Sequence, residues 1–276
     1  MPVHQDQSVS SSASEAGSLD LFEHNRAAWN RQAAQQGDWS RPVDGAEVAA
    51  ARQGDCRVRL TPGPLPAGWL GEVTGSRILC LASGGGQQAP LLAAAGADVT
   101  VLDASDLQLA QDRKVAQREA LSLRTVLGDM RDLSVFPDGG FDLIFHPISN
   151  LYVPDIRPVW RECHRVLRPG GRLLSSFYNP VVFVGDRDPA WGRQGLIRPM
   201  YRLPYADIRD LEAGALADKR ARGEALVFGH SLEEQIGGQL EAGFVLRGFH
   251  EDFQPQPRFA IDPYLPTFLA TWAHKP

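Results

Sequence analysis

The chain has 276 residues, of which 43% are hydrophobic and 22% are charged. This is enough apolar material for a buried core in one large domain or two small ones. With 28 basic and 33 acidic residues the formal net charge is −5, so no basic surplus is available to neutralise a nucleic-acid backbone or an anionic membrane. We therefore expect neither nucleic acid nor a membrane as a partner.

Cysteine usage and the apolar segments indicate a cytoplasmic protein. Cys56, Cys80 and Cys163 are odd in number and show no Cys-x-x-Cys spacing, which disfavours a disulfide framework and a zinc site. No segment approaches the roughly 20 apolar residues that a membrane span needs. The sequence thus predicts a globular protein of a reducing compartment, without a bound metal.

The first 75 residues divide into a tail, a helix and a linker. Residues 1–20 are polar and Ser-rich and lack an apolar h-region, which predicts a disordered tail. Apolar residues recur at helical spacing over residues 19–34. The segment TPGPLPAGWLG at 61–71 is too rich in Pro and Gly for regular structure. We expect residues 21–75 to form a helix and a linker that cover the site of the following domain.

Residues 76–178 alternate short apolar runs with helical patterns. The runs are continuous, as is typical of strands buried on both faces, and they lie at Arg77–Ala82, Asp98–Leu102, Arg124–Leu127, Phe141–Phe145 and Arg172–Phe177. Helical patterns lie between them near 87–95, 106–119 and 155–167. Repeated βαβ units predict an α/β fold with a doubly wound, mostly parallel sheet.

Residues 179–224 break this alternation. They are dense in arginine, proline and aromatic residues, which predicts an inserted cap over the strand ends. A solvated face is the plainer interpretation of this segment. As a substrate segment it would suit an acidic or aromatic molecule through Arg187, Arg193, Arg198, Tyr201, Arg202 and Tyr205.

Residues 225–276 resume regular structure and are expected to complete the sheet. Ser231 with Glu234 three residues later is typical of a capping box, and Gly243 ends that predicted helix. The strand FVLRGFHEDF follows. A last apolar run, Thr267–Trp272, is predicted to return as the edge strand.

A glycine turn follows the first predicted strand, in the segment ILCLASGGGQQ that ends at Gln88. Glycines let the backbone pass close to a ligand, and free N–H groups at the start of a helix attract electron-rich groups. Asp103 ends the second strand, 19 residues after Gly84, where an acid can accept both hydroxyls of a ribose. A purely structural turn, and a helix N-cap at Asp103, remain as alternatives.

A carboxylate and a methionine follow the third predicted strand. Asp129 can accept from the exocyclic amine of a purine, and Met130 can pack on the face of the ring. The alternative is a solvated turn followed by a core methionine. Together with the glycine turn and Asp103, these residues indicate a nucleoside site.

The same segments stand in the order of the motifs of a known family. The succession ILCLASGGGQQ, VTVLDAS, GDMRDLSVFPDGGFDLI and VWRECHRVLRPGGRLL, over about residues 76–178, resembles class I (Rossmann-like) S-adenosylmethionine (SAM)-dependent methyltransferases. The resemblance implies a seven-stranded sheet whose last strand is antiparallel. Residues 230–244 and the ending ATWAHKP resemble a bacterial subgroup of uncharacterised methyltransferases.

The resemblance assigns the parts of SAM to these segments. It implies that the glycine turn receives the methionine part, that Asp103 holds the ribose, and that Asp129 with Met130 holds the adenine. The expected cofactor-binding residues are Ala82, Ser83, Gly84, Gly86, Gln87, Gln88, Asp103, Ala104, Asp129, Met130, His146 and Trp29.

The glycine turn departs from the family pattern at two places. The family usually carries an acid two residues before the first glycine of the turn; here that place is Cys80, and the glycine itself is Ala82. Loss of the acid removes one anchor for the sulfonium and the amino group. Either the affinity for SAM is modest, or Gln87 and Gln88 compensate.

Two further residues are candidates near the transferred methyl group. His146 follows the fourth predicted strand and is the candidate general base, because the pKa of a histidine lies near neutral pH. The alternative is a histidine that supports the backbone of the site. Trp29 on the N-terminal helix can close over the cofactor by a cation–π contact, or it can staple the helix onto the sheet.

The resemblance implies an enzyme that transfers a methyl group from SAM to a small molecule by in-line displacement and releases S-adenosylhomocysteine (SAH). Positioning and desolvation supply much of that acceleration, so no catalytic constellation need be visible. A SAM-binding protein without turnover is the alternative from another class. An NAD(P)-dependent oxidoreductase shares the glycine turn, but no tyrosine here has a lysine four residues later, as the short-chain type requires.

Overall fold

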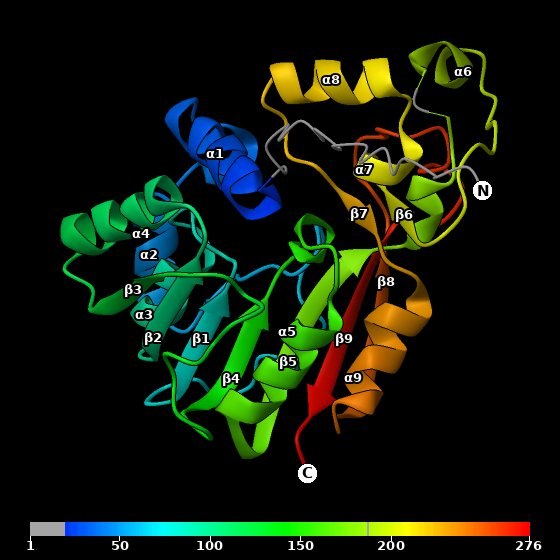
Figure 1. Cartoon of the computed structure of the whole chain (residues 1–276). Helices are drawn as coiled ribbons and strands as arrows, with labels where there is room; N and C mark the ends of the chain where they lie inside the picture. The colour runs from blue at the N-terminus through cyan, green and yellow to red at the C-terminus, as the bar shows by residue number, and fades with distance from the viewer. Residues whose placement is uncertain (1–19, 187) are drawn as a thin grey trace, which may run out of the picture.

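A single twisted sheet forms the centre of the molecule, and the computed structural model describes residues 20–186 and 188–276 (Figure 1). The sheet has seven strands in the order β3-β2-β1-β4-β5-β9-β8, and β9 is antiparallel to both of its neighbours. The strands are β1 (Arg77–Leu81), β2 (Asp98–Asp103), β3 (Leu123–Leu127), β4 (Phe141–His146), β5 (Leu167–Tyr178), β8 (Val245–Asp252) and β9 (Phe268–His274). The predicted seven-stranded, mostly parallel sheet with its last strand antiparallel is confirmed.

Helices cover both faces of the sheet and its carboxyl end (Figure 1). The longer ones are α1 (Leu21–Ala34), α2 (Gly45–Arg52), α3 (Gln88–Ala94), α4 (Asp106–Glu119), α5 (Arg157–Val166) and α8 (Ala213–Ala221). Short helical turns are η1 (Asp38–Ser40), η2 (Asn150–Tyr152), η3 (Pro180–Phe183), α6 (Pro189–Arg193), α7 (Asp207–Asp210), η4 (Glu233–Gly237) and α9 (Gly238–Glu241). No helix among the described residues is long and apolar enough to cross a bilayer.

Strand β1 shows why the apolar runs of the sequence are continuous. Its side chains alternate between two cores, with Ile78 and Cys80 packed under α2, α3 and α4 on one face of the sheet. Leu79 and Leu81 pack against α5 on the other face. Because successive strand residues point to opposite faces, a sheet covered on both sides requires apolar residues at every position.

The C-terminal part completes the sheet, but not in the predicted order. Strand β9 pairs with β5 along Arg172–Tyr178 and with β8 on its other side. The prediction that Thr267–Trp272 forms the edge strand is therefore wrong, because β8 is the edge. This order suits the apolar run, since a strand between two neighbours is buried on both faces. The predicted capping box is confirmed: Ser231 Oγ accepts from the N–H of Glu234 at 3.2 Å, and Glu234 Oε2 accepts from the N–H of Ser231 at 2.8 Å.

The cap contains α6, α7, α8 and a small sheet of β6 (Tyr205–Ala206) and β7 (Phe228–Gly229). Tyr205 is buried against Phe183, and their rings stack with centroids 5.9 Å apart. The guanidinium of Arg198 is paired with Asp186. Tyr205 and Arg198 thus make their contacts within the cap. Arg187 and most of the predicted tail (residues 1–19) lie outside the described residues.

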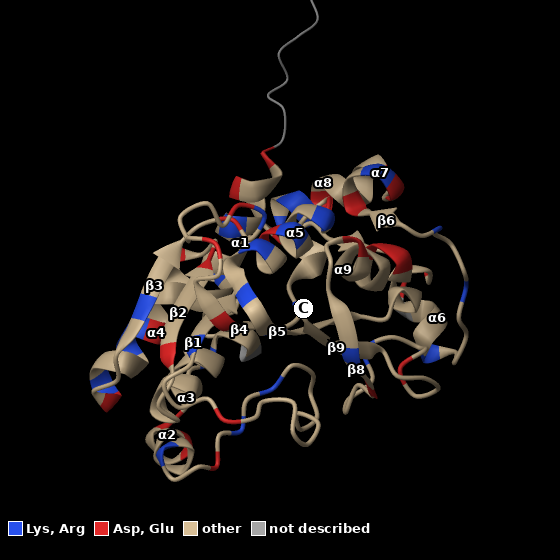
Figure 2. Cartoon of the chain, turned by 90° about the horizontal axis from the view of Figure 1, so that it is seen from below, with Lys and Arg blue, Asp and Glu red and all other residues tan. Residues whose placement is uncertain are grey.

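Charges of both signs are mixed on the surface. In the view of Figure 2, helices α7 and α8 each carry acidic and basic residues side by side.

Candidate active site

A cavity of about 800 Å³ opens at the carboxyl ends of the parallel strands. It lies where the strand order reverses, since β1 pairs with β2 on one side and with β4 on the other. Ligands of open α/β sheets bind at such a switch point. The described residues that line it come from α1, segment 39–62, the turns after β1, β2 and β3, loop 147–154, Tyr178 and Pro255.

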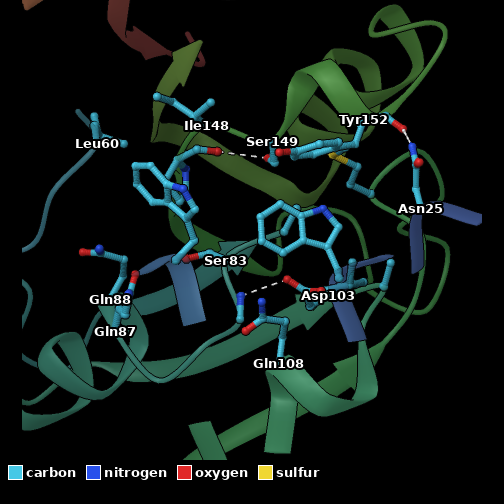
Figure 3. Close-up of a pocket in the computed structure, with 18 of the residues that line it drawn as sticks. Asn25, Leu60, Ser83, Gln87, Gln88, Asp103, Gln108, Ile148, Ser149 and Tyr152 are labelled. Carbon is cyan, nitrogen blue, oxygen red and sulfur yellow. Dashed lines mark hydrogen bonds between the residues drawn. The ribbon is translucent and has the colours of Figure 1, made fainter. Parts of the chain in front are cut away.

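The glycine turn and Asp103 are joined directly (Figure 3). The N–H of Gly84 donates to Asp103 Oδ2 at 2.9 Å, and the N–H of Ser105 donates to Asp103 Oδ1 at 2.8 Å. A Cβ on Gly84 would lie 3.1 Å from Asp103 Oδ2 and 2.9 Å from Gln108 Cβ, so only glycine fits this close approach. The cap of α4 is Ser105, which accepts from the N–H of Gln108. The alternative of Asp103 as N-cap is therefore wrong.

Asp103 is a half-buried acid that lines the cavity. Burial raises the pKa of its carboxyl, while the N–H groups of Ser105 and Gly84 lower it. A cation or a pair of hydroxyl donors in the cavity would stabilise the ionised form. The carboxylate is thus placed to receive a polar, electron-poor ligand.

Two buried polar atoms near Asp103 have no hydrogen-bond partner in the part of the chain that the structure describes. Ser83 Oγ and Gln108 Oε1 are both buried and unbonded, and both residues line the cavity. Gln108 is held by its amide, since Nε2 donates to Ser40 Oγ at 2.6 Å. Buried polar atoms require partners, so these two atoms fit a ligand with hydroxyl and amino groups. Gln108 was not among the site residues expected from the sequence, because its role depends on the position of segment 39–62.

The third strand end also borders the cavity. Asp129 and Met130 line it, and Met130 is buried. The guanidinium of Arg131 is bonded to the Asp129 carboxylate, with Nε to Oδ2 at 2.9 Å. A purine at this end would meet a flexible apolar side chain and an acid already fixed by a cation.

Helix α1 forms one wall of the cavity. Trp29 lines it and packs edge-on against Tyr152, with ring centroids 5.1 Å apart. The helix is anchored by Asn25, whose Nδ2 donates to the carbonyl of Tyr152 at 3.0 Å, and by Asn30, whose Oδ1 accepts from Ser105 Oγ at 2.5 Å. The aromatic contact and the anchoring together place Trp29 at the cavity and fasten α1 to it.

The glutamines after the glycine turn hold the N-terminal segment. Gln87 Nε2 donates to the carbonyl of Arg41 at 3.1 Å, and Gln88 Oε1 accepts from the N–H of Arg59 at 2.8 Å. Segment 39–62, predicted from sequence only as part of a linker, is thereby drawn across the cavity. Both glutamines line it, as do Ala82 and Ala104.

Two predicted site residues do not line the cavity. Gly86 packs inward, where an added Cβ would lie 3.0 Å from Pro42 Cβ. His146 is buried with Nδ1 2.9 Å from the carbonyl oxygen of Leu81 and Nε2 2.5 Å from Asn150 Oδ1. Burial lowers the pKa of His146, so the neutral ring is favoured. These contacts fit a histidine that supports the end of β1 and do not fit a general base.

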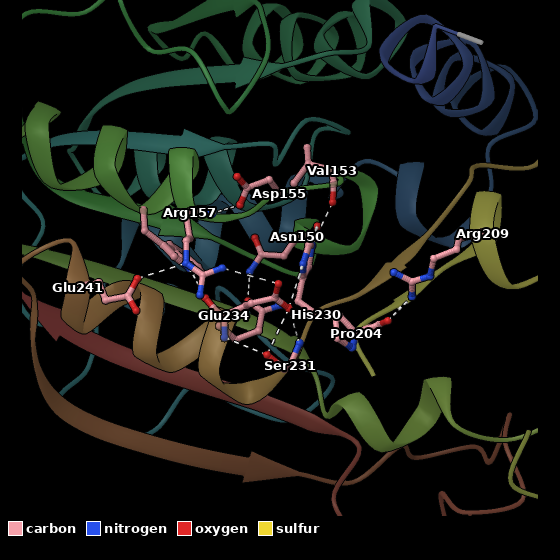
Figure 4. Close-up of polar contacts among 12 residues, drawn as sticks. Asn150, Val153, Asp155, Arg157, Pro204, Arg209, His230, Ser231, Glu234 and Glu241 are labelled. Atoms are coloured by element: carbon pink, nitrogen blue, oxygen red, sulfur yellow. Dashed lines mark hydrogen bonds and ion pairs between the residues drawn. The ribbon is translucent and has the colours of Figure 1, made fainter. Parts of the chain in front are cut away.

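The loop after β4 forms the wall next to α1 and is braced from behind (Figure 4). His230 Nε2 lies 3.1 Å from the carbonyl oxygen of Asn150 and 3.0 Å from that of Val153. Asn150 Nδ2 also donates to Gln235 Oε1 at 2.8 Å. These contacts tie the loop to the segment around η4, so Ile148 and Ser149 present a firm surface to the cavity.

Aromatic residues contribute to the cavity lining, and a cation lies close to one of them. Trp39 and Tyr178 line the cavity together with Leu60 and Ile148. The guanidinium carbon of Arg258 lies 5.4 Å from the centroid of the Trp39 ring. Burial raises the pKa of the Tyr178 hydroxyl, while the charge of Arg258 lowers it. None of the described cap residues lines the cavity, so the expected role of the cap arginines and tyrosines in binding is not supported.

Comparisons with known proteins agree with this geometry. A family model described as a methyltransferase domain matches residues 79–175. The chain is 46% identical over 252 residues to the uncharacterized methyltransferase YbaJ of Bacillus subtilis, covering 91% of this chain and 97% of the relative. A SAM-dependent methyltransferase structure from Mesorhizobium loti has a TM-score of 0.54 at 22% identity, covering 75% of this chain and 94% of that one. The [4+2]-cyclase SpnF has a TM-score of 0.56 at 19% identity, covering 92% and 94%.

The sheet order and the matched domain define a methyltransferase with the class I, Rossmann-like fold. Within that class, the chain belongs to the methyltransferase family that includes YbaJ of Bacillus subtilis. This assignment replaces the oxidoreductase alternative.

Proposed function

We propose that this chain binds SAM in the cavity and transfers its methyl group to a small molecule held beside it, with SAH as the product. SAM supplies a methyl group activated by a sulfonium. The observation that carries the proposal is a pair of buried atoms without a hydrogen-bond partner among the described residues, Ser83 Oγ and Gln108 Oε1, in residues that line the same cavity as Asp103. A ribose and an amino acid moiety offer the hydroxyl and amino groups that such atoms require.

The residues of the chain would hold SAM along the strand ends. Asp103 would accept from the ribose hydroxyls, and Asp129 with Met130 would bind the adenine. The turn from Ala82 to Gln88 would receive the methionine part, and Trp29 would cover it. In this proposal residues 21–75 act as the cover of a cofactor-binding core formed by residues 76–178.

Positioning and exclusion of water would supply the acceleration. The cavity lies between α1, segment 39–62 and the braced loop 147–154, so a bound pair of reactants is held in a desolvated space. His146 is not proposed as a base, because both of its ring nitrogens face protein oxygens.

We propose an acceptor that is aromatic or anionic. Trp39 and Tyr178 are aromatic residues of the cavity lining, and Arg258 lies behind Trp39 with its guanidinium over that ring. Arg258 does not itself line the cavity, but the ion pairs of the described residues include none for it, so its charge would act on a ligand beside Trp39. The free thiols of Cys56, Cys80 and Cys163 also fit the cytoplasmic location we propose.

The test is a methyl-transfer screen with isotopically labelled SAM against a panel of aromatic acids and their uncharged amides. Formation of SAH with labelled product from an aromatic acid, more slowly from its amide, is the expected result. SAM binding without SAH formation across a broad acceptor panel would favour the alternative of a SAM-binding protein without turnover. Absence of SAM binding would overturn the proposal.

A further inference from the structure

A buried carboxylate on α4 holds the glycine turn from behind. Asp112 is fully buried. Its Oδ2 accepts from the N–H of Gly85 at 3.0 Å and its Oδ1 accepts from the N–H of Gly86 at 3.1 Å. One carboxylate thus bonds two consecutive backbone N–H groups with its two oxygens. Such charge-assisted bonds to backbone donors are among the stronger hydrogen bonds in proteins.

We propose that Asp112 is the positioning residue of the SAM site, which in its ionised form holds the glycine turn in the shape that receives SAM. It thereby takes the place of the acid that this chain lacks at Cys80. The inference rests on the proposed function, because it concerns the affinity of the same cavity for SAM.

The surroundings of the turn leave it little freedom. An added Cβ on Gly86 would lie 3.1 Å from the carbonyl oxygen of Gln111, and one on Gly85 would lie 3.1 Å from that of Trp39. The turn is therefore enclosed between α4 and segment 39–62. Within that space, Asp112 is the charged acceptor of the two N–H groups, and the N–H of Gly85 also donates to the carbonyl oxygen of Gln108 at 3.2 Å.

The chemistry of the pocket makes the charge of Asp112 sensitive to pH. Burial raises the pKa of Asp112 to about 8, with a further rise from Asp103 on β2, while the N–H groups of Gly85 and Gly86 and the nearby Arg113 lower it. Cys80 on β1 also faces Asp112, and burial raises the pKa of that thiol well above its usual value, so it stays neutral. The ionised fraction of Asp112 consequently changes between pH 7 and 9.

Ionised Asp112 and a sulfonium cation stabilise each other. If only the ionised form holds the turn correctly, the apparent affinity is reduced by the fraction that is ionised, which is about 10-fold between pH 9 and pH 7 for a group that titrates near 8. SAM binding near pH 7.5 would then release protons.

The experiment is calorimetric titration of the full chain with SAM at pH 7, 8 and 9, with Asp112→Asn as the variant. An asparagine of the same shape can accept only one of the two N–H groups, and its amide faces the other. The expected result is a wild-type affinity that rises about 10-fold from pH 7 to 9. In Asp112→Asn it would be roughly 10- to 100-fold weaker at pH 9 and nearly independent of pH.

The matched control is Asp207→Asn. Asp207 is another buried acid, which accepts from the N–H of Val227 and from Lys219 in the cap, away from the cavity. This variant should lose stability but keep the pH dependence of SAM binding. A second measurement needs no variant: titration of the wild type near pH 7.5 in two buffers of different ionisation enthalpy should reveal proton release.

The outcomes separate the two proposals. An Asp112→Asn variant that binds SAM with the same affinity and pH dependence as the wild type would overturn the role of Asp112 alone. Binding without proton release in the wild type would do the same. A wild type that binds no SAM at any of these pH values would overturn both the proposed function and this inference.

Discussion

Asp103 and Gly84 stand at the ends of two neighbouring strands and are joined by a hydrogen bond of 2.9 Å from the N–H of Gly84 to Asp103 Oδ2. The bond couples the turn that would receive the methionine part of SAM to the acid that would hold its ribose. Because α4 begins directly after Asp103 and its Asp112 holds the next two N–H groups of the turn, the site is fixed by short connections within the core. The binding geometry is therefore present before a ligand arrives.

The backbone at Ala82 gives a prediction about stability. Ala82 has a φ of 47°, in the left-handed region that glycine adopts without penalty. Ala82→Gly relieves roughly 1 kcal/mol of backbone cost, and it loses about as much from the half-buried methyl group and from the greater freedom of glycine in the unfolded chain, so stability should change by less than about 0.5 kcal/mol. The same substitution at Ala89, buried in α3, should cost about 1.5–2 kcal/mol. Urea denaturation of both variants checks this, and an equal loss in both would contradict it.

Replacement of His146 should affect stability and leave the chemistry intact. His146→Gln should retain the turnover number of the enzyme, because the histidine lies behind the cavity wall. Burial lowers the pKa of His146, so the unfolded chain takes up a proton near pH 6.5 that the folded chain refuses. Stability is thus lost as the pH falls below 6.5.

The variant tests this linkage through its unfolding free energy at pH 7 and 5.5. On acidification the unfolding free energy of the wild type should fall more steeply than that of the variant, by up to about 1.4 kcal/mol per pH unit. A turnover number that falls 100-fold in a stably folded His146→Gln variant would instead identify the histidine as the base.

Replacement of Arg258 should weaken binding of the acceptor and leave binding of the cofactor unchanged. Arg258→Gln removes the cation over Trp39, so the KM for an anionic acceptor should rise about 10-fold, within the range of a charged hydrogen bond, while the Kd for SAM stays the same. Arg198→Gln is the matched control, since Arg198 lies 5.3 Å from the Trp191 ring centroid in the cap, which does not line the cavity. Equal effects of both substitutions on steady-state kinetics would argue against an acceptor site at Arg258.

The elements of the fold that were predicted from the sequence are those that depend on local patterns. The five parallel strands and the turns after them follow from continuous apolar runs and from glycine, so their places were predicted closely. The place of β9 between β5 and β8 depends on pairing between distant segments, which no local pattern reports.

The site shows the same division. The burial of His146 could not be predicted from the sequence, because it depends on the segments that cover the end of β4. The role of segment 39–62 depends on bonds from Gln87 and Gln88. One feature of the sequence indicates a role for Asp112: it lies three residues after Leu109 and four before Ala116, on the buried face of α4. A charged residue on an apolar helix face requires a partner, and here that partner is the glycine turn.

The central claim is that Asp103 binds SAM in this cavity. Calorimetric titration of the wild type and Asp103→Ala with SAM, SAH and NAD tests it most directly. We predict micromolar binding of SAM and SAH, no binding of NAD, and a loss of roughly 1.5–3 kcal/mol of SAM affinity in Asp103→Ala, which is on the order of 10- to 150-fold. Unchanged SAM affinity in a folded Asp103→Ala variant, or binding of NAD alone, would contradict the account.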